Sequence, residues 1–91
     1  MNMRHNEESL LEFPCDFSIK AMGRDEPGFR DLVVEIVATH ARFDPKDDVK
    51  EQSSNKGNFI SVTVTLLAEN QNQLDLIYQS LHDHDRVLMV F

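Results

Sequence analysis

The sequence predicts an α+β domain, in which a four-stranded antiparallel sheet carries both of its helices on one face. Three observations indicate this class. Two segments repeat apolar residues with a helical period, and the segments around them have the alternation or composition of strands. Their order along the chain is strand, helix, strand, strand, helix, strand. Each helix has a single apolar stripe, and the strands have one apolar and one more polar face, so the helices are expected on the same side.

The first strand is expected over residues 16–23, where apolar and polar side chains alternate. Phe17, Ile19 and Ala21 form one face, and Ser18, Lys20 and Met22 form the other. Residues 1–9 are polar without periodicity, which predicts a flexible tail or a short capping turn. Leu10, Leu11 and Phe13 are expected to pack on the domain as a short helical turn that Pro14 ends.

The first helix is expected to open in the segment Gly23-Arg24-Asp25-Glu26-Pro27-Gly28-Phe29. Its apolar stripe is Phe29, Leu32, Val33, Ile36 and Val37. Asp25 is expected to cap this helix and Pro27 to lie in its first turn. Pro45 is expected to enforce its end, after Arg42-Phe43-Asp44.

The second and third strands are expected to form a hairpin. Residues 46–54 contain Val49 as their only strongly apolar member, which is typical of a charged edge strand. Residues 53–58 are expected to turn, with Gly57 in the left-handed conformation. Residues 59–68 alternate a fully apolar face with a threonine-rich face that includes Ser61, Thr63 and Thr65.

The second helix is expected to start at Asn70, which forms a capping-box pattern with Gln73. Its apolar stripe is Leu74, Ile77, Tyr78 and Leu81. Asp85 and Arg86 are expected to turn the chain into a last strand over residues 87–91. The arrangement is ferredoxin-like, with strands one and three in the middle of the sheet, the charged strand at one edge and the last strand at the other.

Composition limits the class of protein. The 91 residues are expected to form one domain over residues 1–91, with a net charge of -7 that opposes binding to nucleic acid or an anionic membrane. Cys15 is the only cysteine, so no intrachain disulfide can form. Without an apolar signal core or a long apolar run, we expect a cytoplasmic bacterial protein with no nucleic-acid or membrane partner.

Three blocks carry a resemblance to a known family: Leu10-Leu11-Glu12-Phe13-Pro14, residues 17–23 and residues 53–62. In this order and spacing they resemble the YbeD-like family of small bacterial proteins of unassigned function. That family resembles ACT domains, and Asp25-Glu26-Pro27-Gly28-Phe29 is similar to the ACT loop that contacts an amino-acid effector. The resemblance implies a regulatory domain, with Gly23, Arg24, Asp25, Pro27 and Gly28 as ligand-binding positions and a link to lipoate metabolism.

From the residues alone, the loop over residues 23–29 has two interpretations. Helix N-terminal amides and Arg24 would suit a small carboxylate. Alternatively, Asp25 caps the helix while Pro27 and Gly28 form a turn. The sequence pattern favours the structural interpretation.

Other chemistry-bearing residues predict no catalytic site, metal site or cofactor. His82-Asp83-His84-Asp85 could hold a metal, but side chains two apart on a helix diverge, and His5 and His40 are isolated. Cys15 lies between Pro14 and Asp16, a poor setting for a nucleophile. We therefore expect no enzyme.

The leading hypothesis is a non-catalytic regulatory or adaptor domain that contacts a partner protein or associates with itself. Its expected interface combines the polar sheet face with the apolar last strand: Lys20, Met22, Ser61, Thr63, Thr65, Val87 and Met89. RNA binding on this face is less favoured, because Phe59 is the only aromatic residue placed for stacking. The alternative hypothesis is a sensor of an amino-acid-like carboxylate at residues 23–28.

Overall fold

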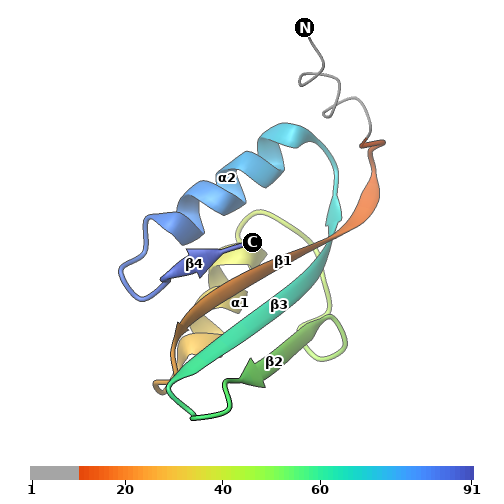
Figure 1. Ribbon diagram of the computed structural model, residues 1–91. Helices are drawn as coiled ribbons and strands as arrows, with labels where there is room; N and C mark the ends of the chain where they lie inside the picture. The colour runs from red at the N-terminus through yellow and green to blue at the C-terminus, as the bar shows by residue number, and fades with distance from the viewer. Residues whose placement is uncertain (1–10) are drawn as a thin grey trace, which may run out of the picture.

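The computed structural model describes residues 11–91, and the predicted tail over residues 1–9 and Leu10 lie outside this part of the chain. The elements are β1 (Cys15–Arg24), α1 (Phe29–Ala38), β2 (Val49–Ser53), β3 (Phe59–Ala68), α2 (Gln71–His82) and β4 (Met89–Val90) (Figure 1). The strand order is β2-β3-β1-β4, with every neighbouring pair antiparallel. The predicted fold class and strand order are both confirmed.

The centre of the sheet is the ladder between β1 and β3, which runs from Cys15 opposite Ala68 to Arg24 opposite Phe59. Because side chains alternate along a strand, one face of this ladder is apolar and supports both helices. The core beneath the helices is formed by Ile19, Ala21, Ile60, Val62, Val64, Leu66 and Ala68 of the two strands and Phe29, Val33, Val37, Leu74, Ile77 and Leu81 of the helices. The other face of the sheet is covered by neither helix (Figure 1).

The entry into α1 differs from the prediction. Gly28 is the N-cap residue, with φ 83° in the left-handed region, and no side chain caps the helix. Asp25 is not the cap: its N–H donates to the Asn58 carbonyl oxygen at 3.0 Å. Pro27 also lies before the helix rather than in its first turn, because the chain needs residues 25–28 to turn from β1 into α1.

The end of α1 also differs from the prediction. The helix stops at Ala38, well before Pro45. The Thr39 hydroxyl donates to the Glu35 carbonyl oxygen at 3.0 Å, and the chain then turns so that Ala41 and Phe43 pack against the core. Burial of these two apolar side chains, and not the proline, fixes where the helix ends. At the start of the described chain, Leu11 and Phe13 pack against the core, as predicted. Residues 11–14 do not form the predicted helical turn.

The cap of α2 is confirmed. Asn70 Oδ1 accepts the Gln73 N–H at 2.8 Å, and Gln73 Oε1 accepts the Glu69 N–H at 2.6 Å. The same Gln73 donates through Nε2 to the His40 carbonyl oxygen at 2.9 Å. One side chain therefore caps α2 and attaches the helix to the segment that follows α1.

The two edges of the sheet are built differently. In β2 only Val49 is buried, and the predicted left-handed Gly57 in the following turn is confirmed. Arg30 of α1 holds this edge, with Nη2 donating to the Pro45 carbonyl oxygen at 2.7 Å and Nε 3.2 Å from Glu51 Oε2. Charged side chains thus protect the β2 edge from pairing with other chains.

The opposite edge strand, β4, is shorter than the predicted 87–91. It spans Met89–Val90, although Leu88 and Phe91 also donate backbone hydrogen bonds to β1, each at 2.8 Å. Val87 is not in the strand. Its side chain is buried in the core, and its N–H donates to the His84 carbonyl oxygen at 3.0 Å, which makes it part of the turn after α2.

Candidate interaction surface

The uncovered side of the sheet, which we call the open face, collects side chains from all four strands. Across the central ladder, Ser18 lies opposite Thr65, Lys20 opposite Thr63, Met22 opposite Ser61 and Arg24 opposite Phe59. The β2 register adds Lys50 opposite Thr63 and Gln52 opposite Ser61, and the β4 register adds Met89 opposite Met22. Six of the seven predicted interface residues, Lys20, Met22, Ser61, Thr63, Thr65 and Met89, therefore lie on one continuous surface.

Val87 is the exception. Its side chain is only 8% exposed and belongs to the hydrophobic core, so the prediction that it lies in the interface is wrong. Its position just before the edge strand suggested exposure, but the turn after α2 directs the side chain inward.

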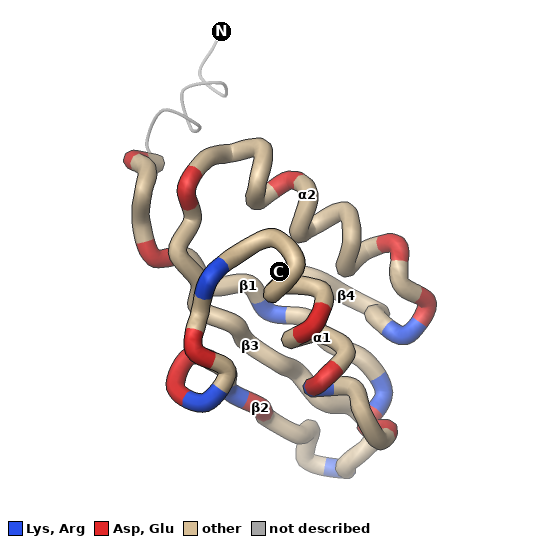
Figure 2. Tube along the Cα trace, turned by 180° about the vertical axis from the view of Figure 1, so that it is seen from behind, with Lys and Arg blue, Asp and Glu red and all other residues tan. Residues whose placement is uncertain are grey.

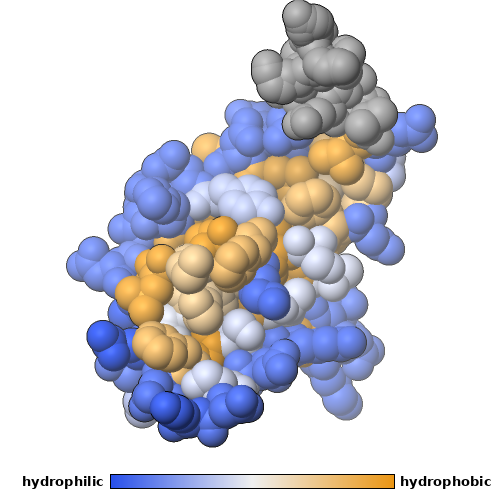
Figure 3. All heavy atoms as spheres, viewed as in Figure 1, coloured by the Kyte–Doolittle hydropathy of each residue, from blue (hydrophilic) through white to orange (hydrophobic). Residues whose placement is uncertain are grey.

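The open face is partly apolar. Met89 is 48% exposed and Phe91 is 56% exposed, and Met22 between β3 and β4 is half-buried. Figure 3 shows the corresponding apolar area over β4 and the neighbouring part of β1. Phe91 was not among the predicted interface residues. Its reciprocal backbone hydrogen bonds with Lys20 place it on this face, and the pairing register that creates this contact cannot be read from the sequence.

Two cations lie over aromatic rings on this face. Lys20 Nζ is 5.9 Å from the centroid of the Phe91 ring, and the Arg24 guanidinium is 5.8 Å from the centroid of the Phe59 ring. Both distances are within the range of cation–π attraction. Arg24 was predicted as a ligand-loop residue, but it is the last residue of β1. The alternation of β1 continued by two residues would have placed it beside Lys20 and Met22.

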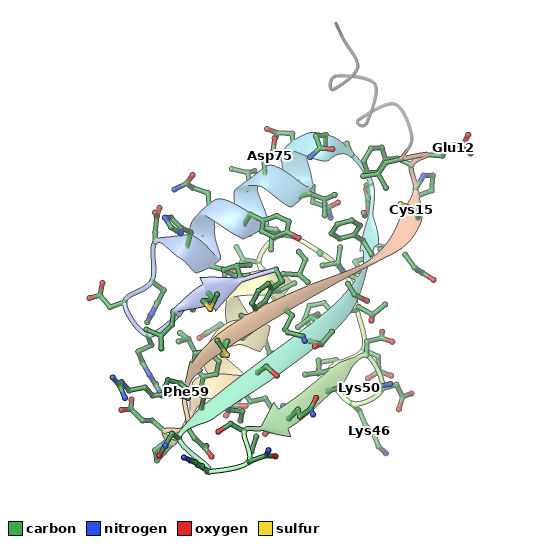
Figure 4. The ribbon with its side chains drawn as sticks, viewed as in Figure 1. Glu12, Cys15, Lys46, Lys50, Phe59 and Asp75 are labelled. Carbon is green, nitrogen blue, oxygen red and sulfur yellow. The ribbon has the colours of Figure 1, made fainter. Side chains whose placement is uncertain are left out.

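A depression of about 150 Å³ opens on this face near the hairpin between β2 and β3. It is lined by Met22, Gln52, Ser53, Ser54, Phe59, Ile60 and Ser61. Figure 4 shows Phe59 at this end of β3, with Lys50 further along β2. The open face thus combines an apolar hollow with cations on the adjoining strands.

The loop over residues 23–29 is closed by Arg86. Its Nη2 donates to the Pro27 carbonyl oxygen at 2.9 Å and to the Glu26 carbonyl oxygen at 3.4 Å, and its Nε is 3.8 Å from Glu26 Oε1. The guanidinium also lies 5.9 Å from the centroid of the Phe29 ring. The Arg86 guanidinium is therefore engaged by the loop itself. Arg86 comes 59 residues after Pro27, so sequence spacing gave no signal of this contact.

Gly23 has a structural reason to be glycine. A Cβ built on it would lie 2.5 Å from the Arg86 carbonyl oxygen and 2.5 Å from Phe29 Cε1. The predicted ligand positions Gly23, Asp25, Pro27 and Gly28 accordingly have packing or turn roles, and Arg24 contacts Phe59 on the open face. Gly23 and Arg24 thus end β1, while Asp25, Pro27 and Gly28 form the turn before α1, and the Arg24 side chain lies over Phe59 on the open face.

A second, wider depression of about 570 Å³ lies between α2 and β4. It is lined by Asp75, Tyr78, Gln79, His82 and Val90, and none of these belongs to the predicted ligand loop. Burial raises the pKa of the Tyr78 phenol above its usual value. Figure 4 shows Asp75 on α2.

The other candidate residues are dispersed. His84 Nδ1 accepts the Arg86 N–H at 3.1 Å, and His40 Nε2 lies 3.3 Å from the Ser80 hydroxyl. Cys15 is half-buried against the core. Within residues 11–91, no group of three or more histidine, cysteine or acidic side chains is placed to hold a metal ion. In the same range, neither helix is long and apolar enough to cross a membrane.

Residues 8–91 match the family described as "Protein of unknown function (DUF493)". A UPF0250 protein of Nitrosomonas europaea is 45% identical over 84 residues, which are 92% of this chain and 97% of that protein. A UPF0250 protein of Neisseria gonorrhoeae is 41% identical over 90 residues, with 99% of each chain covered.

Solved structures share the fold at low identity. The ACT domain from a GTP pyrophosphokinase of Chlorobium tepidum superimposes with a TM-score of 0.65 at 14% identity, with 84% of each chain covered. Protein HP0495 from H. pylori superimposes with a TM-score of 0.66 at 17% identity, with 89% of this chain and 85% of that chain covered. The chain therefore has the fold of ACT domains, as its loop sequence suggested.

Proposed function

The chain belongs to the DUF493 family of proteins of unknown function, and we propose that it is a non-catalytic regulatory or adaptor domain that acts by docking its open face on a partner protein. ACT domains, whose fold it shares, support a regulatory role by analogy. The observation that carries the proposal is the open face itself, a sheet surface without a covering layer.

The apolar content of this face favours a protein partner. A sheet in a small domain normally has a polar outer face where it meets water. Here Met89 and Phe91 are each about half exposed and adjoin the half-buried Met22. Clustered exposed apolar side chains with polar neighbours are typical of protein interaction sites. The threonine and serine hydroxyls of β1 and β3 add hydrogen-bonding groups around them.

The alternative hypothesis, a sensor of a small carboxylate at residues 23–28, stays a prediction. The contacts of Arg86 with the loop carbonyls and with Glu26 favour a structural role for this segment. The link to lipoate metabolism implied by the family resemblance also stays a prediction, as does a cytoplasmic location.

Affinity capture from an extract of the source cells tests the proposal. The tagged chain is compared with a Met89→Ser/Phe91→Ser variant, which removes apolar groups from the open face. The matched control is Leu76→Ser on α2, because Leu76 is 46% exposed and lies outside the open face. Circular dichroism verifies that the three proteins are folded.

We expect the unchanged chain and the Leu76 variant to retain the same partner, and the Met89/Phe91 variant to lose it. Recovery of no reproducible partner by the unchanged chain under gentle conditions would overturn the proposal. Equal recovery by all three proteins would place the binding surface elsewhere and contradict the role of the open face.

A further inference from the structure

We propose that the open face recognises an acidic protein segment, which places an apolar side chain in the depression beside Phe59 and its carboxylates on Lys20, Arg24 and Lys50. This inference rests on the proposed function and specifies the chemistry of the partner. It follows from how charge is distributed over the two sides of the sheet.

The charges are segregated. The chain as a whole carries -7, yet the strand positions on the open face hold the cations Lys20, Arg24 and Lys50 and a single carboxylate, Asp16. The helix side of the sheet carries Asp31 and Glu35 of α1 and Asp75 of α2 beside the single cation Arg30. Most other acidic residues lie in the loops and turns around the sheet, as Figure 2 shows. The open face is therefore cationic although the chain as a whole is acidic.

The cations of this surface are not neutralised within residues 11–91. The ion pairs in this range involve Arg30 and Arg86, which hold the β2 edge and the loop before α1. Lys20 and Arg24 instead lie over the rings of Phe91 and Phe59, which keeps their charged groups close to the apolar surface. Their charge remains for a partner's carboxylates to neutralise. The free energy of this attraction is larger when the contact excludes water.

The depression supplies the apolar anchor. Its volume of about 150 Å³ is below the roughly 300–1,000 Å³ of small-molecule sites. It suits a single apolar side chain of a protein partner, the kind of anchor around which interfaces concentrate their binding energy. Arg24 is the cross-strand neighbour of Phe59, which lines the depression, so a carboxylate next to the anchor would meet this cation.

The same geometry argues against two other occupants. A second copy docked open face to open face would bring like cations together, which is unfavourable. Single-stranded nucleic acid needs free aromatic faces for base stacking, but the faces of Phe59 and Phe91 already carry Arg24 and Lys20.

The test is an NMR titration of the full isotope-labelled chain with three defined probes. These are a short amphipathic peptide of glutamate and leucine, its lysine and leucine counterpart, and an oligouridylate RNA. Each titration is repeated on a Lys20→Glu/Arg24→Glu/Lys50→Glu variant. The matched control is Arg42→Glu/Lys46→Glu/Lys56→Glu, which makes the same change in net charge at exposed positions outside the open face.

We expect only the glutamate and leucine peptide to shift the amides of open-face residues, with binding weakened by added salt. The open-face variant should bind this peptide at least about tenfold more weakly, and the control variant should bind it as the unchanged chain does. No shift, shifts confined to the helices, or equal loss in both variants would overturn the inference. Shifts of the open-face amides by the oligouridylate alone would assign the face to nucleic acid instead. A captured partner that depends on Met89 and Phe91 but not on the cations would keep the proposed function and refute this inference.

Discussion

Replacing Gly23 with alanine is expected to destabilise the fold, although alanine is normally the better residue in a strand. The added Cβ would lie 2.5 Å from both the Arg86 carbonyl oxygen and Phe29 Cε1, whereas non-bonded atoms prefer roughly 3.5–4.0 Å. The carbonyl belongs to the backbone, and the Phe29 ring is 1% exposed in the core. Neither group can move away without disturbing other contacts.

The magnitude follows from two opposing effects. Overpacking a core costs about 1–3 kcal/mol, and the replacement of a strand glycine by alanine returns about 0.5–1 kcal/mol. The expected net loss in the free energy of unfolding is about 1–2 kcal/mol. For a domain of this size, such a loss lowers Tm by roughly 5–15 °C.

Urea unfolding and a thermal melt measure this loss, with Gly57→Asn as the control. Gly57 has φ 72° and no atom near its Cβ position, and asparagine tolerates this conformation, so its effect should be within about 0.5 kcal/mol. Phe29→Leu in the Gly23→Ala background should recover part of the loss, because the shorter side chain removes the ring atoms. An unchanged Tm for Gly23→Ala, with no coupling to Phe29, would refute the packing argument and return Gly23 to the candidate ligand positions.

Three further perturbations test individual contacts. Asn70→Ala removes the cap of α2 and should cost about 1 kcal/mol in urea unfolding, whereas Asn72→Ala on the exposed first turn of the same helix should cost much less. Arg86→Met should speed amide exchange of Asp25, Glu26 and Phe29 about tenfold, and unchanged exchange would show that Arg86 does not hold the loop. Burial raises the pKa of Tyr78 in the folded state. As pH rises, the unfolded chain therefore loses the phenolic proton before the folded chain does. The free energy of unfolding should decline above about pH 10. Tyr78→Phe should reduce that decline in urea unfolding measured across alkaline pH, and an identical decline in both proteins would contradict this assignment.

Much of the fold follows from patterns that act over short sequence distances. The alternation of residues 59–68 and the stripe of α1 predict their buried faces, because one side of each must be apolar to pack. The Asn70–Gln73 cap is correctly predicted for the same reason, since both partners lie within one turn. The charges around Val49 identify the edge strand.

The predictions that failed depend on contacts between distant segments. Asp25 is a good capping residue by type, but its N–H donates to Asn58 just beyond the end of the β1–β3 ladder, and Gly28 is the N-cap instead. Val87 was predicted as an exposed strand residue, but its N–H donates to His84 in the turn after α2 and its side chain is buried in the core. The interaction surface was predicted in part. Strand alternation placed Lys20 and Met22 together and, continued by two residues, would have included Arg24, whereas Phe91 joins them only through the pairing register of β4.

The separation of the open-face cations from the carboxylates of the helices and surrounding loops gives the molecule a direction as well as a binding surface. Beyond contact distance, an acidic partner repels the helical side and attracts the sheet, within a screening length of about 8 Å at physiological ionic strength. Rotational diffusion is therefore biased before the two proteins touch, and more encounters begin with the sheet foremost. For such a domain, salt acts mainly on the rate of association, while the apolar depression governs how long the complex lasts.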